Sequence, residues 1–154
     1  ENKKHFKMKT KNKKHWVNKS LLLIAAALIL FPISSCAQKL KFSTSSVVPA
    51  AQGTVKVKKD NNNNFLIKIH IDNLADPQRL TPSRSVYVVW LVTDENSPQN
   101  IGEIVTSKKF LSSKLQADFQ SVSSTKPTRI FITAEKESGM QNPYNEVILT
   151  TQNF

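Results

Sequence analysis

The 154-residue chain carries a formal net charge of +11, but most of that charge lies in residues 1–20, which hold eight lysines and Glu1. Residues 36–154 hold 14 basic and 10 acidic residues without a block of like charges, and this pattern argues against nucleic-acid binding. Cys36 is the only cysteine, so no disulfide can form within the chain. The 118 residues after Cys36 must therefore bury an apolar core, and they suffice for one domain.

A basic leader and a short apolar run predict a signal peptide in residues 1–35. The apolar run Leu21–Ile33 has 13 residues, which as a helix would span roughly 20 Å, short of the ~30 Å hydrocarbon core of a bilayer. Lysines precede this run and small residues follow it. Because Met8 stands directly before the pattern, we expect Met8 to be the native start and residues 1–7 to be an upstream extension.

The segment ends in Ile33-Ser34-Ser35-Cys36, which resembles the lipobox of bacterial lipoproteins. The resemblance implies that the thiol of Cys36 receives a diacylglycerol and that a dedicated peptidase cuts just before it. Ala37 and Gln38 lack the aspartate that marks retention at the inner membrane in Gram-negative lipoproteins, which favours the outer membrane, facing the periplasm. Cleavage after Ala37, which would release a freely secreted protein, is the alternative.

Residues 36–52 are expected to form a tether between membrane and domain, because their serines and lysines suit a flexible linker. Some apolar residues leave room for a first edge strand within it, namely Leu40, Phe42, Val47 and Val48. From Gly53 to Lys58 apolar and polar residues alternate, which predicts a half-buried strand. The run Asp60–Asn64 then predicts a hairpin turn, since Asp and Asn tolerate left-handed backbone conformations.

Two segments carry the strongest strand patterns. Phe65–Asp72 alternates, with Phe65, Ile67, Ile69 and Ile71 on one face and Leu66, Lys68, His70 and Asp72 on the other. Val86–Val92 is apolar on both faces, which predicts a central strand covered on both sides with Trp90 as its core anchor. Between them, Asn73–Ser85 contains two prolines and is predicted to be a long loop.

Weaker patterns complete the predicted fold. The remaining expected strands are Ile101–Thr106, with Gly102 at a bulge, Leu115–Gln120, Arg129–Glu135 and Glu146–Thr151. The segments between them are predicted loops: Asp94–Asn100, Ser121–Thr128 and Glu137–Asn145. About seven short strands with regular turn signals predict an all-β chain that folds over residues 53–154 into an antiparallel β-sandwich of immunoglobulin or fibronectin type. A small barrel is the alternative.

Two of these segments are similar to the extracytoplasmic C-terminal domain of anti-sigma-K factors. Tyr87 with Trp90-Leu91 matches its Tyr-x-x-Trp-Leu core strand, and Ile130–Glu135 followed by Val147–Leu149 matches its closing strand pair. The resemblance implies a shared fold over about Gly53–Thr151 rather than a shared activity. That family places a sigma-binding domain and a full transmembrane helix first, so we expect at most its outer, sensory or interaction domain here.

The sequence contains no Gly-x-Gly-x-x-Gly, P-loop or His-Glu-x-x-His motif. His70 is the one histidine after Cys36, and a lone histidine on a polar strand face indicates plain surface rather than a metal ligand or catalytic base. Neighbouring carboxylates are interpreted as solvated turn charges, as in the pairs Asp94 with Glu95 and Glu135 with Glu137. We therefore predict no enzymatic activity, no cofactor and no metal site.

Recognition is expected in the loops of a rigid sandwich. The candidate residues are Arg79, Pro82 and Arg84 in Asn73–Ser85, and Met140, Pro143 and Tyr144 in Glu135–Glu146. Simple capping of the sandwich, with Tyr144 covering a core edge, is the alternative.

The sequence thus predicts a lipid-anchored, extracytoplasmic protein of the bacterial cell envelope with a non-catalytic interaction or sensing domain. Its expected partners are a membrane, through the lipid on Cys36, and an unidentified envelope protein. A structural or assembly lipoprotein of a larger envelope complex and a secreted soluble β-sandwich protein are the alternatives.

Overall fold

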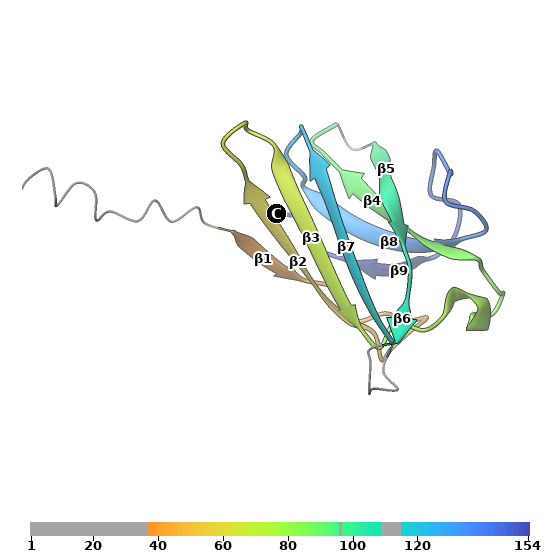
Figure 1. The fold of residues 1–154 in the computed structure, drawn as a ribbon. Coiled ribbons are helices and arrows are strands. Elements are labelled where there is room, and N and C mark those ends of the chain that lie inside the picture. Colours follow the sequence, from red (N-terminus) through yellow and green to blue (C-terminus); the bar gives the residue numbers. More distant parts are fainter. Residues whose placement is uncertain (1–36, 96, 109–114) are drawn as a thin grey trace, which may run out of the picture. The chain divides into compact units, whose positions relative to one another are not determined.

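A computed structural model describes residues 37–95, 97–108 and 115–154, which form two antiparallel β-sheets packed against each other (Figure 1). These residues contain nine strands and one short 3-10 helix, η1 (Pro77–Arg79). The signal peptide predicted for residues 1–35 and the predicted lipid acceptor Cys36 lie outside the described residues.

The two sheets confirm the predicted antiparallel β-sandwich. The first has the order β1-β2-β3-β7-β6, with β1 (Gln38–Lys41), β2 (Gln52–Lys59), β3 (Phe65–Asp72), β7 (Leu115–Ser123) and β6 (Ser107–Lys108). The second has the order β5-β4-β8-β9, with β5 (Pro98–Ile104), β4 (Val86–Val92), β8 (Arg129–Glu135) and β9 (Val147–Thr150). Without the short edge strands β1 and β6, seven strands remain, in the sandwich architecture shared by fibronectin type III domains.

The tether predicted for residues 36–52 is wrong over the part that the structure describes. Gln38–Lys41 pairs with β2 as an edge strand, and Val48 and Ala51 are buried, so the domain begins at Gln38. Beyond β1 the chain crosses to the second sheet, where Phe42 pairs with Thr151. This four-residue edge strand places only Leu40 against the core, which is why its pattern is weak.

Other boundaries also differ from the prediction. β5 begins at Pro98, inside the predicted turn, because the first position of an edge strand tolerates a residue without a backbone donor. β7 continues to Ser123, inside the predicted loop, because β3 offers pairing partners as far as Phe65. The two-residue strand β6 was not predicted. The expected turn and bulge are confirmed: Asp60 Oδ1 accepts backbone hydrogen bonds within the hairpin turn, and Gly102 has a φ of 135° at the register shift in β5.

The main core lies between the two sheets and confirms the predicted faces of the strands. Its central side chains are at most 2 % exposed and come from β3, β4 and β8: Ile67, Ile69, Ile71, Tyr87, Val89, Leu91, Ile130 and Ile132. Burial of each such apolar side chain contributes about 1.5–3 kcal/mol, so this layer is a major source of stability for the sandwich.

A second, smaller cluster covers the outer face of β4 and β8. It consists of Val88, Trp90 and Val92 with Phe131, and Met140 from the loop after β8 packs against it. Trp90 is fully buried and stacks on Phe131 with the ring centroids 6.2 Å apart. The prediction of a central strand covered on both sides is confirmed, with Trp90 buried beneath a loop rather than between the sheets.

Candidate interaction surfaces

The two predicted recognition loops, Asn73–Ser85 and Glu135–Glu146, meet at one end of the sandwich. Arg84 Nη2 donates to Asn145 Oδ1 over 2.9 Å, which joins the loops through their side chains. The backbone N–H of Ser85 also donates to the carbonyl oxygen of Glu135 over 2.9 Å. Two segments that are about 60 residues apart in the sequence therefore form one continuous surface, called here the loop surface.

Glu135 holds this surface together from below. The residue is fully buried, and its Oε1 accepts hydrogen bonds from the backbone N–H groups of Tyr144 and Asn145, at 3.1 and 3.3 Å. Its Oε2 accepts from the side-chain amide of Asn145. A buried carboxylate is tolerated when its oxygens are satisfied by hydrogen bonds, and here those donors fix the end of the loop.

The interpretation of Glu135 as a solvated turn charge is thus wrong, whereas Glu137 is exposed as expected. The sequence did contain a signal for its burial. Glu135 continues the alternation of Phe131 and Thr133, and that face of β8 is apolar at Phe131 and covered. A carboxylate in register with a covered face needs buried donors, and the loop after β8 supplies them.

The same carboxylate is tied to the second apolar cluster. Trp90 Nε1 donates to Thr133 Oγ1 over 2.8 Å, and Thr133 Oγ1 donates to Glu135 Oε1 over 2.7 Å. The hydrogen bonds therefore run without a break from the centre of β4 to the loop surface. Because the chain of groups is fully buried up to the loop, it fixes the loop geometry relative to the sheet.

The loop surface presents apolar and basic groups around a shallow hollow of about 460 Å³, lined in part by Arg84, Met140 and Tyr144. Tyr144 is 83 % exposed, so the alternative in which its ring covers a core edge is wrong. Arg79 and Pro82 are also exposed, but Arg79 borders a different hollow of about 440 Å³. Of the predicted candidates, the structure thus brings Arg84, Met140 and Tyr144 together.

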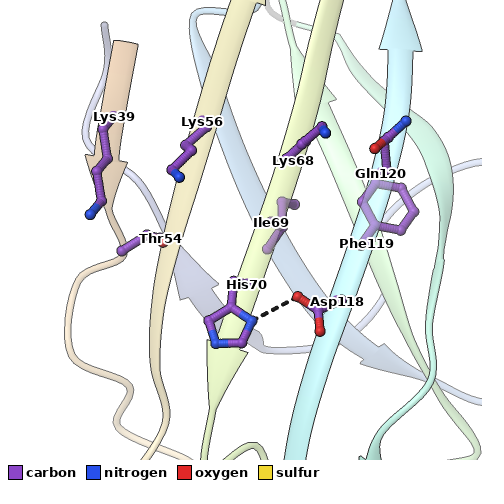
Figure 2. A pocket seen from close by; sticks show the side chains of 9 residues that line it. All are labelled: Lys39, Thr54, Lys56, Lys68, Ile69, His70, Asp118, Phe119 and Gln120. Atoms are coloured by element: carbon purple, nitrogen blue, oxygen red, sulfur yellow. Dashed lines mark hydrogen bonds and ion pairs between the residues drawn. The ribbon is translucent and has the colours of Figure 1, made fainter. Parts of the chain in front are cut away.

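A third hollow, which the sequence did not reveal, lies on the outer face of the first sheet. It measures about 560 Å³ and runs across β1, β2, β3 and β7 (Figure 2). Lys39, Lys56 and Lys68 stand side by side there, since β1, β2 and β3 place them directly opposite one another. The alternation of the strands could have indicated this row, but only once the pairing of β1 with β2 was known.

His70 lies on this face and is exposed, as predicted. Its Nδ1 is 2.7 Å from Asp118 Oδ1 (Figure 2). Its Nε2 is 3.6 Å from Asp72 Oδ2. Among the described residues, no group of three or more His, Cys, Asp or Glu side chains is placed to hold a metal ion. The imidazole thus contacts Asp118 across the strands and Asp72 along its own strand, on the open face of the sheet.

The comparisons with known proteins add no relative: no protein-family model, curated protein or solved structure matches the chain. Within the described ranges there is no helix with the length and apolarity that a membrane span requires.

Proposed function

We propose that the protein is a lipid-anchored interaction or sensing module of the bacterial cell envelope, held in the membrane by Cys36 and binding a protein partner with its loop surface. The lipobox-like sequence and the β-sandwich support this function together. It requires no catalytic group. The resemblance to the outer domain of anti-sigma-K factors is then a likeness of fold and of extracytoplasmic placement, without the sigma-binding activity.

The observation that carries the proposal is the rigid construction of the loop surface. The buried carboxylate of Glu135 and the Arg84–Asn145 hydrogen bond hold the backbone that carries the exposed Tyr144 in a defined position. Tyrosine is enriched at protein interfaces because its large ring loses little conformational entropy on binding. Exposed and fixed in this way, it is a suitable anchor for a partner.

The placement of the two ends supports the same function. β1 begins beside the β2–β3 hairpin, since Gln38 is opposite Val57 and Ile67 is the next partner across the sheet. The loop Asn73–Ser85 follows the other end of β3, where Asp72 is five residues or roughly 17 Å beyond Ile67. A lipid on Cys36 would therefore hold one end of the sandwich at the membrane and leave the loop surface free at the other.

The anchor is tested by the intact mass of the full chain after expression in a Gram-negative host. The expected product is membrane-bound, begins at Cys36 and carries a diacylglycerol, with or without an added acyl chain. Cys36→Ser should give an uncleaved or soluble product, because a hydroxyl does not accept the lipid. A mature chain that starts at Gln38 without lipid would contradict the anchor and indicate a secreted β-sandwich.

The loop surface is tested by photo-crosslinking in intact cells of the native host. A crosslinking amino acid at position 144 is compared with one at Ser124, which is exposed at the opposite end of the sandwich. We expect a discrete adduct from position 144 that is absent from position 124. Adducts of equal yield from both positions, or none from position 144, would contradict recognition by the loop surface.

A further inference from the structure

The outer face of the first sheet changes in character along the strands. Beside the β2–β3 hairpin, the opposed residues are Lys58, Leu66 and Val122. The next outward-facing row is Lys39, Lys56, Lys68 and Gln120, and the row after it is Lys41, Thr54, His70 and Asp118. At the far end the row is Gln52, Asp72 and Gln116. The face therefore passes from apolar and basic near the hairpin to polar and acidic near the loops.

The basic row is unfavourable for folding by itself. Side chains that are directly opposite on antiparallel strands have Cβ atoms about 4.5–5.5 Å apart, and like charges in such pairs destabilise the sheet. Lys56 stands between Lys39 on one side and Lys68 on the other. The ion pairs of the described residues involve His70 with Asp72 and Asp118 and none of these lysines. The row thus has the composition of a site for an external anion.

The apolar residues next to the row indicate what kind of anion. Val122 is 59 % exposed and stands opposite the half-buried Leu66, beside Lys58. Exposed aliphatic groups bordered by lysines suit the boundary between lipid headgroups and acyl chains, where the apolar side chains enter and the ammonium groups meet phosphate. A small soluble anion would contact the lysines but would have no apolar group to pack against Leu66 and Val122.

The proposed lipid on Cys36 would place this face close to a membrane, and this step rests on the proposed function. Cys36 is two positions before Gln38, the first residue of β1, and two peptide units span only about 7 Å. A lipid on Cys36 would keep the β1 edge, and with it the lysine row, next to the bilayer surface. Over such a distance the attraction between lysines and anionic headgroups is not lost to screening.

We propose that this face, centred on Lys39, Lys56 and Lys68, binds the phosphate groups of anionic phospholipids in the membrane to which the chain is attached. The contact orients the domain, so that the loop surface is directed away from the bilayer. Each basic residue near an anionic membrane surface strengthens binding roughly fivefold, so three lysines together act on the order of a hundredfold.

The test measures binding of the full chain to vesicles in the Cys36→Ser background, which lacks the lipid acceptor. Lys56→Gln/Lys68→Gln is compared with Arg79→Gln/Lys136→Gln, which removes the same charge from exposed positions outside the face. The vesicles are phosphatidylcholine alone or phosphatidylcholine with phosphatidylglycerol. Urea midpoints equal to that of the parent show that both variants are folded. The leader contributes equally in all chains, so the ratio between variants isolates the face.

On the anionic vesicles we expect the Lys56/Lys68 variant to bind roughly 25-fold more weakly than the parent, and the Arg79/Lys136 variant to change by less than about twofold. On phosphatidylcholine alone the three chains should bind alike. An equal loss of vesicle binding for both variants would mean that only net charge matters, and it would overturn the inference. No loss of binding for either variant would overturn it too. Because the assay needs no lipid on Cys36, its failure is independent of the intact-mass result for the anchor.

Discussion

Replacing Glu135 with glutamine tests whether a buried carboxylate fixes the loop surface. Glutamine keeps one oxygen for the donors on Oε1 but places an NH₂ group where Oε2 faces the side-chain amide of Asn145. If the Asn145 amide rotates so that its oxygen accepts from the glutamine NH₂, the NH₂ group of Asn145 faces Arg84 Nη2 instead. Either way one half-buried donor loses its acceptor.

The magnitude follows from the bonds involved. A hydrogen bond to a charged group contributes about 1.5–3 kcal/mol, and a buried donor left unsatisfied costs about 1–3 kcal/mol. The orphaned donor is only half-buried, so water offsets part of its cost, and relief from burying the charge offsets more. We therefore expect Glu135→Gln to lower the free energy of unfolding by about 2 kcal/mol. With an m value of about 2 kcal/mol/M, the urea midpoint measured by circular dichroism falls by about 1 M.

A compensating change sharpens the test. In Glu135→Gln/Asn145→Asp the glutamine NH₂ can donate to one oxygen of the new carboxylate, and the other oxygen can accept from Arg84, so every group has a partner again. Asn145→Asp alone sets two carboxylates against each other and should destabilise. The double variant should therefore recover at least half of the loss, with a coupling energy of about 2 kcal/mol. Purely additive effects, or an unchanged midpoint for Glu135→Gln, would refute the role assigned to the carboxylate.

Two further predictions concern the buried aromatic residues of β4. Trp90→Ala should lower the free energy of unfolding by about 3–5 kcal/mol in urea titrations, because it leaves a cavity beneath Met140 and removes the donor to Thr133. An unchanged urea midpoint would contradict this packing. Burial, with a smaller contribution from Asp76, raises the pKa of Tyr87 above its ordinary 10.0. The phenol of Tyr87 stays protonated in the folded state at a pH where it ionises in the unfolded state. Above about pH 10 the free energy of unfolding of the wild type should therefore fall by up to about 1.4 kcal/mol per pH unit relative to that of Tyr87→Phe. Parallel plots of unfolding free energy against pH for the two proteins would contradict this prediction.

The strands that the sequence predicts best are those whose burial is visible in a short window. β3 alternates and β4 is apolar throughout, so both were predicted with their correct ends. β1 has no such pattern, because it packs at an edge and its stability comes from pairing with β2. A four-residue edge strand of mostly polar residues cannot be distinguished from a linker without knowledge of its partner.

The loop surface could be predicted only in part. Arg84, Met140 and Tyr144 were candidates because they are prominent residues in loops of a sandwich. The fixation of Arg84 and Tyr144 through Glu135 and Asn145 depends on hydrogen bonds between groups up to 61 positions apart, which no local pattern encodes. The lysine row likewise exists only after three strands are set in register. Lysines from three separate segments form one charged surface only when the strands pair.

The crossing of the chain from β1 to the second sheet has a mechanical consequence. If the proposed lipid on Cys36 holds the start of the chain, a partner that pulls on the loop surface would load the domain along the axis of β1. Strand β1 runs from the end beside the β2–β3 hairpin towards the loops, so its hydrogen bonds to β2 would be strained in shear, all together, rather than opened one after another. The pairing of Phe42 with Thr151 and the bond from Ser43 to Thr150 pass part of that load to β9. Both sheets then resist detachment of the first strand.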